Sequence, residues 1–476
     1  MKIGSIINGD EMKPSKETMT VTNPYNNEVV AEIALAAEEE LNRAIDNSYD
    51  TFHQTTKKMP AHERGDILLK ASNLLEERLE EFAETITKEA GKPLQFSRGE
   101  VERSMQVLRF AAEEAKHMEG EVLPMDAAIG GKNRFGFTKR VPLGVVAAIT
   151  PFNFPLNLTL HKVAPAIAAG NTIILKPAEK TPLSAYKLVQ LLHEAGLPKG
   201  ALNLVLGTGK EIGDPLVKHE RIHKVTFTGS LPVGRTIRKN AGFKKVTLEL
   251  GSNSPNILFE DADLNEAIPS LVKGSFAFSG QVCISAQRIY VHQNIYESFL
   301  NEFIRQTEAL TIGDPMNEET DFGPMINEDE AKRAKTWIDD AVNHGATIKT
   351  GGERNGTILK PTIMTDVKSD MKIIAEEVFA PIVSVIPFSS ENQVVSKSND
   401  SIYGLQAGIF TKDIDRAFRI ADQLEMGGVW INEISTYRQD NHPYGGVKQS
   451  GIGREGVKYA LEDMTEMKFY GIKLNG

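Results

Sequence analysis

The residues of this sequence best suited to covalent chemistry are Glu249 and Cys283, the only cysteine among 476 residues. Cys283 lies in FSGQVCIS, where small residues before it leave room for a substrate. A helix beginning close to Cys283 would lower the pKa of its thiol. Glu249 lies in the apolar run VTLELG, where burial would raise its pKa toward that of a general base at neutral pH. The pair predicts a thiol nucleophile and a carboxylate base.

Asn153 is a third candidate, in the stiff loop TPFNFP just past a predicted strand. Its amide could donate a hydrogen bond to an oxyanion. All three candidates also have structural explanations. A lone cysteine can be a small buried side chain, an asparagine beside proline can serve a turn, and Glu249 can pair with a lysine such as Lys245.

The elements that must position these residues begin at Gly144, where short apolar strands start to alternate with helical patterns. The predicted strands are 145–150, 172–177, 203–207, 224–229, 246–251 and 256–259. The predicted helices are about 157–169, 182–195, 211–218 and 231–241. This alternation predicts an α/β fold whose parallel sheet is covered on both faces. Ligands of such sheets bind beyond the carboxyl ends of the strands.

Two of these strand ends carry residues that suit a dinucleotide. Lys176 and Glu179 follow the second strand and suit the two hydroxyls of a ribose, although a solvated loop pair is the alternative. A carboxylate at that place would repel a 2′-phosphate, so NAD is favoured over NADP. Gly209 and Gly213 follow the third strand in GTGKEIG, one residue off the dinucleotide spacing, and could simply serve a tight turn.

The end of the fourth strand allows two interpretations. Gly229 and Ser230 follow Phe227 where a helix should begin, which is a natural place for a pyrophosphate. The same stretch, GSLPVGRT, is one substitution from a phosphate-binding loop, and ILFED could end in a magnesium-binding carboxylate, as in an ATPase. Arg235 stands where that loop needs lysine, and an ATPase would leave Cys283 without a role.

The rest of the chain contains further helices, a second α/β series and a strand arm. Helices are predicted at 61–90, 97–118, 262–278, 294–309, 328–344 and 413–425. Later strands are predicted at RIYVHQ, IVSVIPF, AGIFT and GGVWIN. The segments NRFGFTKRV and MTEMKFYGIK read as strands that form an arm able to pair with another subunit.

Composition narrows the class of protein. The length predicts two or three domains, and the net charge of −10 argues against nucleic acid as a partner. One cysteine excludes an intrachain disulfide and any CxxC metal site, so no metal is expected. The start has no apolar signal segment, and no apolar run is long enough for a membrane span. A cytoplasmic protein is therefore expected.

Taken together, the motifs resemble the aldehyde dehydrogenase superfamily across essentially the whole chain. They are TPFNFP, KPAEKTP, FTGSLPVG, LELGSNSP, GQVC, EEVFAPI and PYGGVKQSGIGREG. The resemblance implies a Rossmann-type cofactor domain (1–123 and 143–253), an α/β catalytic domain (254–452) and a small β oligomerisation arm (124–142 and 453–476). A homodimer or homotetramer is implied as well.

The resemblance also implies a role for each candidate. Cys283 would be the nucleophile, Glu249 the base that activates the hydrolytic water, and Asn153, with the backbone amide of Cys283, the oxyanion hole. The cofactor-binding residues would be Thr150, Pro151, Phe152, Lys176, Glu179, Gly209, Gly213, Phe227, Gly229, Ser230, Gly251, Glu377 and Phe379. The reaction is then NAD(P)-dependent oxidation of an aldehyde to an acid through a thiohemiacetal and a thioester. Glu249 argues against a member that transfers the thioester to coenzyme A.

Departures from the family pattern bear on the substrate. Ala380 replaces the usual glycine of EEVFGP, and Ser252 and Asn253 replace the usual Gly-Lys after LELG. With these residues the chain resembles a subgroup of the family that includes enzymes for lactaldehyde, phosphorylated glyceraldehyde, and phosphonate or sulfonate aldehydes. A short hydroxylated or anionic aldehyde is therefore expected, and a succinic semialdehyde-type or broad-specificity enzyme is the alternative.

Four residues are candidates for binding the tail of such a substrate: Arg109, His161, Tyr437 and Arg438. Two arginines and a histidine would suit an anionic group. The alternative is that Arg109 and Arg438 form structural ion pairs and that His161 is a satisfied helix residue.

Overall fold

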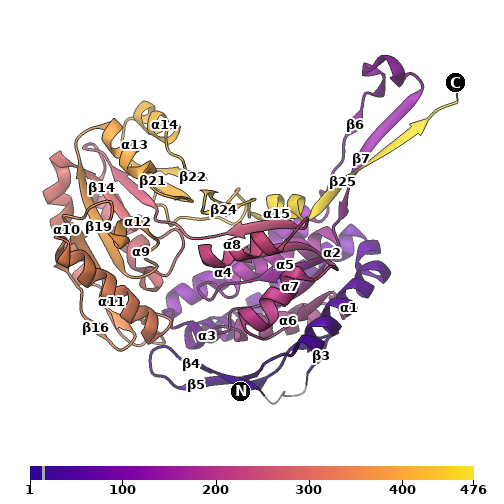
Figure 1. The fold of residues 1–476 in the computed structure, drawn as a ribbon, viewed down its shortest axis with the longest axis horizontal. Helices are drawn as coiled ribbons and strands as arrows, with labels where there is room; N and C mark the ends of the chain where they lie inside the picture. The colour runs from indigo at the N-terminus through magenta and orange to yellow at the C-terminus, as the bar shows by residue number, and fades with distance from the viewer. Residues whose placement is uncertain (13–16, 476) are drawn as a thin grey trace.

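The computed structural model describes residues 1–12 and 17–475, which form two lobes and a projecting arm (Figure 1). The first lobe contains an eight-stranded sheet in the order β24-β12-β11-β8-β9-β10-β2-β3. Its strands are β2 (Ile6–Ile7), β3 (Asp10–Glu11), β8 (Val145–Ile149), β9 (Thr172–Lys176), β10 (Leu202–Leu204), β11 (Ile222–Thr228), β12 (Lys245–Glu249) and β24 (Gly451–Ile452). Strands β8 to β12 run parallel, which confirms the predicted parallel sheet.

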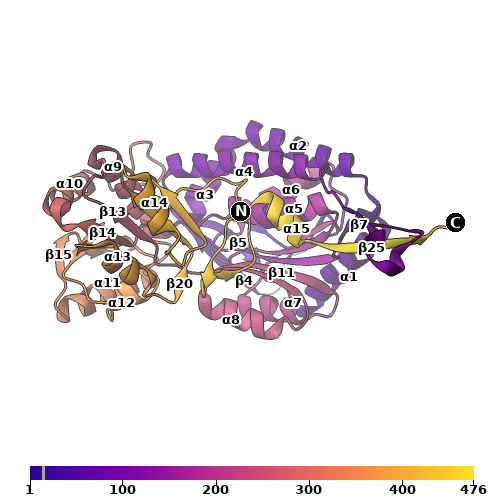
Figure 2. The same ribbon diagram turned by 90° about the horizontal axis from the view of Figure 1, so that it is seen from above.

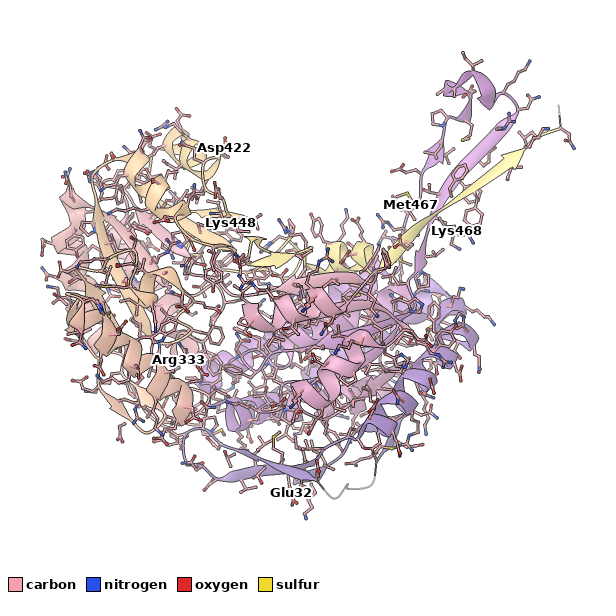
Figure 3. The ribbon with its side chains drawn as sticks, in the orientation of Figure 1. Glu32, Arg333, Asp422, Lys448, Met467 and Lys468 are labelled. Carbon is pink, nitrogen blue, oxygen red and sulfur yellow. The ribbon has the colours of Figure 1, made fainter. Side chains whose placement is uncertain are left out.

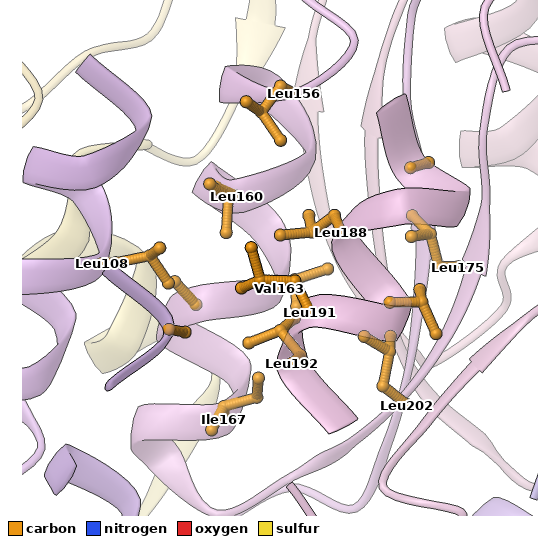
Figure 4. Packing of buried hydrophobic residues seen from close by; sticks show 14 of the residues in the cluster. Leu108, Leu156, Leu160, Val163, Ile167, Leu175, Leu188, Leu191, Leu192 and Leu202 are labelled. Atoms are coloured by element: carbon orange, nitrogen blue, oxygen red, sulfur yellow. The ribbon is translucent and has the colours of Figure 1, made fainter. Parts of the chain in front are cut away.

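Alternate residues of β8 face opposite sides of this sheet. Val146 and Ala148 pack with helices α2, α3, α4, α5, α6 and α15, whereas Val145 and Ala147 pack with α1, α7 and α8. The helices are α1 (Glu38–Gln54), α2 (Ala61–Glu77), α3 (Leu79–Ala90), α4 (Leu94–Glu114), α5 (Asn157–Ala169), α6 (Leu183–Glu194), α7 (Asp214–Lys218), α8 (Leu231–Asn240) and α15 (Val457–Asp463). Figure 4 shows Leu160, Leu188 and Leu175 at the first of these interfaces.

Helix α5 is buried along its whole length, which explains why the sequence there is apolar on every side. It matches the helix predicted at 157–169. The helix predicted at 61–90 is in fact two helices, because the chain breaks at Arg78, whose guanidinium bonds Glu194 on α6. The helix predicted at 211–218 begins instead as a π-helical turn, Gly209–Gly213, which leads into α7.

The second lobe contains a seven-stranded sheet in the order β15-β18-β19-β14-β13-β21-β22 (Figure 2). Its strands are β13 (Pro255–Leu258), β14 (Arg288–His292), β15 (Thr347–Thr350), β18 (Thr362–Thr365), β19 (Ile382–Phe388), β21 (Gln406–Phe410) and β22 (Gly428–Ile431). Its helices are α9 (Leu264–Phe276), α10 (Tyr296–Glu308), α11 (Glu328–Asn343), α12 (Lys372–Ala375), α13 (Glu391–Asn399) and α14 (Ile414–Ala421). The strand predicted at 256–259 therefore belongs to this second sheet, not to the first series.

The arm consists of β6 (Val122–Leu123), β7 (Arg134–Pro142) and β25 (Thr465–Lys473). Strand β25 pairs antiparallel with β7 along its length, and the pair projects from the body of the molecule (Figure 1). Figure 3 labels Met467 and Lys468 on this arm. The segment expected as the arm, 453–476, begins with α15, which packs into the first lobe; its last residue, Gly476, lies outside the described residues.

Short strands complete the described fold. They are β1 (Lys2–Ile3), β4 (Thr18–Thr22), β5 (Val29–Ala34), β16 (Arg354–Asn355), β17 (Ile358–Leu359), β20 (Tyr403–Gly404) and β23 (Val447–Lys448). Strands β1, β5 and β4 form a separate sheet near the N-terminus. Among the described residues, no helix has the length and apolar character needed to cross a membrane.

Candidate active site

Two cavities of nearly equal volume, about 480 and 490 Å³, meet at Cys283. The first opens beyond the carboxyl ends of the parallel strands of the first lobe and also contains Glu249 and Asn153. The second lies between α4, α9 and the segment 433–444. A thiol placed between two cavities can meet a different molecule from each side.

Cys283 is partly buried and follows a 3₁₀ turn, Ala277–Gly280, in which Phe278 and Ser279 adopt left-handed backbone conformations. The Ser279 hydroxyl donates to the carbonyl of Gly323 at 2.7 Å and holds this strained turn in place. No helix begins at Cys283 in the described chain, so the condition for a thiol pKa lowered by a helix dipole is not met. Burial instead raises the pKa of the thiol to about 11, and the hydroxyl of Tyr444, 3.1 Å from Sγ, opposes that rise.

Asn153 is placed beside Cys283 by the loop between β8 and α5. Its Nδ2 donates to the carbonyl of Gln281 at 2.9 Å, which leaves its second amide hydrogen for another acceptor. Glu100 fixes the start of α5, because its Oε1 accepts from the backbone N–H of Leu156 at 2.9 Å and of Asn157 at 3.1 Å. The loop that carries Asn153 is therefore anchored at its far end.

Glu249 ends β12 with both carboxylate oxygens buried and without a hydrogen-bond partner among the described residues. Burial, and then the negative charge of Glu455, raise its pKa well above 4.5. The alternative of an ion pair with Lys245 is wrong, because Lys245 pairs with Glu466 at 2.9 Å. An unpaired carboxylate with a raised pKa can accept a proton near neutral pH.

Glu455 is a second buried carboxylate, close enough to Glu249 to affect its pKa. Unlike Glu249, it contacts two cations. Its Oε1 lies 2.6 Å from Lys162 Nζ, and its Oε2 lies 3.1 Å from Arg438 Nη2. Burial acts to raise its pKa, but the two cations lower it to about 2. Neither Lys162 nor Glu455 was predicted as a site residue from the sequence. A lysine inside the most apolar helix was the available signal for Lys162.

Most of the predicted cofactor residues line the first cavity. They are Thr150, Pro151, Phe152, Lys176, Gly209, Gly213, Phe227, Gly229, Ser230, Glu377 and Phe379. Glu179 and Gly251 lie beside it: Glu179 Oε1 accepts from the backbone N–H of Gly209 at 2.7 Å and lies 3.8 Å from Lys176 Nζ. Gly251 lies against Glu377, and a Cβ there would clash with its carboxylate.

These residues fit a dinucleotide. Helix α8 begins at the cavity, and the side chain of its N-cap, Ser230, makes no capping bond, so the first N–H groups are free for a phosphate. Lys176 adds a cation. Glu377 accepts from the backbone N–H of Ser252 at 3.1 Å, burial raises its pKa to about 7, and it adds an acceptor for ribose hydroxyls.

The four predicted substrate residues separate into two pairs. Tyr437 and Arg438 line the second cavity, whereas Arg109 and His161 line neither cavity. Arg109 forms an ion pair with Glu76 at 2.7 Å on the molecular surface. His161 is fully buried, with Nε2 2.7 Å from Asp440 Oδ1.

Three cationic residues of the second cavity were not predicted: Lys92, Arg103 and Lys273. Lys92 pairs with Glu100, and Arg103 Nη2 lies 2.5 Å from Asp440 Oδ1. Lys273 on α9 forms no ion pair in the part of the chain that the structure describes. No spacing pattern in the sequence connects these three residues.

Comparisons with known proteins agree with this geometry. A 3-sulfolactaldehyde dehydrogenase of Priestia aryabhattai is 49% identical, over 99% of this chain and 98% of its own length. A lactaldehyde dehydrogenase of Methanocaldococcus jannaschii is 42% identical, over 95% and 97%. The structure of aldehyde dehydrogenase 21 of Physcomitrella patens, in complex with the reaction product succinate, superposes with a TM-score of 0.97 at 40% identity, covering 99% of this chain and 98% of that one.

A glyceraldehyde-3-phosphate dehydrogenase of Methanocaldococcus jannaschii, complexed with NADP, superposes with a TM-score of 0.93 at 41% identity, covering 96% of this chain and all of that one. The model of the aldehyde dehydrogenase family matches residues 12–470. A thiol beside an amide donor, an unpaired carboxylate and a dinucleotide-sized cavity form the site that oxidation of an aldehyde requires. The chain belongs to the aldehyde dehydrogenase family and is an NAD(P)-dependent oxidoreductase of aldehydes.

Proposed function

We propose that this enzyme oxidises a short hydroxylated or anionic aldehyde to its carboxylic acid, with Cys283 as nucleophile, Glu249 as base and Asn153 as oxyanion donor. The meeting of the two cavities at Cys283 supports these roles. The aldehyde would enter the second cavity and place its carbonyl carbon against Sγ. The Asn153 amide, with the backbone N–H of Cys283, would hold the alkoxide that forms.

The chemistry divides between the residues of the site. The Cys283 thiolate adds to the carbonyl, and the nicotinamide, when bound, accepts the hydride. Loss of the hydride leaves a thioester on Cys283. Glu249 then takes a proton from a water that attacks the thioester carbonyl, which releases the acid and restores the thiolate. The unpaired carboxylate supports water as the acceptor of the acyl group.

The cofactor cavity supports NAD as the cofactor that the enzyme prefers. Lys176 and Glu179 would hold the adenosine ribose, Gly229 and Ser230 the pyrophosphate, and Glu377 the nicotinamide ribose. The carboxylate of Glu179 would repel a 2′-phosphate. The NADP complex of a relative 41% identical to this chain keeps NADP as the alternative.

The cellular and quaternary assignments belong to the same proposal. We expect a cytoplasmic homodimer or homotetramer, assembled through the arm. On β25 of that arm, Met467, Phe469 and Ile472 are each about half exposed, which supports an interface there. The domain limits remain 1–123 with 143–253 for the cofactor, 254–452 for catalysis, and 124–142 with 453–476 for assembly, although α15 packs on the first lobe.

The observation that carries the substrate class is the cationic lining of the second cavity. Lys92, Arg103 and Arg438 each have a carboxylate partner, whereas Lys273 has no ion-pair partner among the described residues. An unneutralised cation beside the entrance of a substrate favours an anionic tail. The relatives named for 3-sulfolactaldehyde and lactaldehyde support a three-carbon hydroxyaldehyde.

A succinic semialdehyde-type activity is the second candidate, and broad specificity is the third. The relative solved with succinate as its reaction product favours the second candidate. Succinic semialdehyde also carries an anionic group. The unpaired charge of Lys273 therefore supports the first and second candidates equally. Arg438 stays a predicted tail-binding residue, since it lines this cavity and its Nε has no hydrogen-bond partner among the described residues.

The experiment is a comparison of kcat/KM for propanal, lactaldehyde, succinic semialdehyde and 3-sulfolactaldehyde, with NAD and with NADP. We expect the hydroxylated and anionic aldehydes to exceed propanal. Lys273→Met should lower kcat/KM for the anionic aldehydes about tenfold, the effect of losing one partly screened charge, and leave propanal unchanged. Lys349→Met is the matched control, an exposed lysine of the same lobe that lines neither cavity. A preference for propanal, or equal losses for charged and neutral aldehydes, would contradict the proposal.

A further inference from the structure

Tyr444 approaches the reactive sulfur more closely than any other side chain with a hydroxyl in the described site. Its Oη lies 3.1 Å from Cys283 Sγ, and its ring is buried in the wall of the second cavity. Tyr444 belongs to the PYGG motif near the end of the chain. We propose that the hydroxyl of Tyr444 donates a hydrogen bond to the Cys283 thiolate and stabilises the nucleophile before it attacks the aldehyde. The inference rests on Cys283 being the nucleophile of the proposed function.

The ionisation state of sulfur decides the direction of this bond. A neutral thiol is a weak donor, so either atom can donate while Cys283 is protonated. A thiolate has no hydrogen and can only accept. The phenol of Tyr444 is the one hydrogen-bond partner of Sγ in the described chain, so it becomes the donor as soon as Cys283 ionises.

Arg438 fixes the ring that carries this hydroxyl. Its guanidinium carbon lies 3.6 Å from the centroid of the Tyr444 ring, in a cation–π contact. The same guanidinium is held by Glu455, with Nη2 3.1 Å from Oε2. A cation over the ring withdraws electron density from the phenol and makes its O–H a stronger donor. Arg438 therefore acts as a positioning residue for Tyr444.

The charges around Cys283 show why such a donor matters. Burial raises the pKa of the thiol, and the carboxylates of Glu377 and Glu249 act in the same direction. The Tyr444 hydrogen bond and the positive charge of Arg438 oppose these effects. Burial raises the pKa of Tyr444 well above its usual range, and the charges of Cys283 and Glu249 act in the same direction, so its hydroxyl keeps its proton and stays a donor.

A hydrogen bond to the thiolate has two opposing consequences. One hydrogen bond to a charged group is enough to shift the apparent pKa of the thiol by about one unit, or about tenfold in the thiolate fraction. The stabilised thiolate is also less nucleophilic, by about threefold for one pKa unit. Removing the hydroxyl should therefore slow reactions of Cys283 at neutral pH about threefold.

The test measures the reactivity of the thiol without turnover. Cys283 is the only cysteine, so the pH profile of iodoacetamide alkylation reports on this sulfur alone. Tyr444→Phe keeps the ring and removes the hydroxyl. Tyr290→Phe is the matched control, because Tyr290 is also buried, hydrogen-bonded and in contact with an arginine, Arg288, but lines neither cavity.

We expect Tyr444→Phe to raise the apparent pKa of alkylation by about one unit, to slow alkylation at pH 7.5 about threefold and to lower kcat/KM for the aldehyde similarly, with the affinity for NAD unchanged. Tyr290→Phe should keep the profile of the unmodified enzyme. An unchanged or lowered apparent pKa in a folded, NAD-binding Tyr444→Phe enzyme would overturn the role of Tyr444. Failure of the proposed function gives a different result, namely aldehyde oxidation that survives Cys283→Ser.

Discussion

Two cavities of similar size meet at one sulfur atom, yet they are built in different ways. The first, which is the proposed cofactor cavity, is formed by the ends of parallel strands and the loops and helix starts that follow them. The aldehyde cavity is formed by side chains from α4, α9 and the segment 433–444, which lie far apart in the sequence. The first depends mainly on backbone geometry, and the second on which side chains happen to face each other.

This difference separates residues that the fold constrains from residues that can be substituted. In the cofactor cavity, glycines and a helix N-terminus present backbone groups, so few substitutions alter the ligand without disturbing the sheet. In the second cavity, the exposed side chain of Lys273 can be exchanged without moving a strand. Enzymes of one fold can therefore share the cofactor and differ in the aldehyde they oxidise.

The largest expected effect comes from removing the sulfur that joins the two cavities. Cys283→Ser should lower kcat for aldehyde oxidation by about 10⁴-fold or more, because a serine hydroxyl in this site has no base in contact with it. The Kd for NAD, measured by fluorescence quenching, should stay within about twofold, since the cofactor cavity is built from strand ends. A variant that loses NAD binding as well would show that the two cavities are not independent.

The same contrast explains how far the sequence could be interpreted. The parallel sheet, α5 and the cofactor residues follow from strand and helix periodicity and from the rule that ligands bind at strand ends. Asn153 and Glu249 could be singled out because a polar residue at the end of an apolar strand is unusual. The turn before Cys283 could not be predicted, because Phe278 and Ser279 adopt backbone conformations that their residue types do not favour.

The aldehyde cavity was harder to predict for a physical reason. Arg109 and His161 line neither cavity, and their side chains pair with Glu76 and Asp440 instead. Lys273 had no periodic signal, because it occupies an ordinary exposed position on an amphipathic helix. Only the packing of the two lobes brings such residues together, and local patterns do not encode that packing.

A smaller effect should follow from Glu249→Gln, which removes the base but keeps the nucleophile. Thioester hydrolysis should slow about 10²- to 10⁴-fold, so that NADH appears as a burst of one equivalent per subunit before a slow phase. In the unmodified enzyme the steady-state rate should fall as pH falls through the raised pKa of Glu249, and the variant should lose this dependence. Stopped-flow absorbance measures both, and a variant without a burst would place the base before hydride transfer.

The thermal stability of the same variant gives a second readout. The pKa of Glu249 is higher in the folded state than its ordinary value of 4.5, so the unfolded chain releases this proton more readily. Glu249 therefore costs stability as pH rises above 4.5, and Glu249→Gln should raise the Tm at pH 8 relative to the unmodified enzyme. A lower Tm would mean that the carboxylate has a stabilising partner.

The smallest effect concerns the rim of the cofactor cavity. Glu179→Gln keeps the shape of the side chain and removes its charge, so the ratio of kcat/KM for NADP to that for NAD should rise about fivefold, as one like charge near a 2′-phosphate is worth about 1 kcal/mol. Glu211→Gln is the matched control, a carboxylate that accepts from Thr208 Oγ1 in the turn that Glu179 contacts and that, unlike Glu179, forms no ion pair with Lys176 among the described residues. Equal shifts in both variants would mean that the general charge around the rim, and not the position of Glu179, selects the cofactor. In that case, side-chain substitutions would alter the ligand of the cofactor cavity as readily as that of the aldehyde cavity.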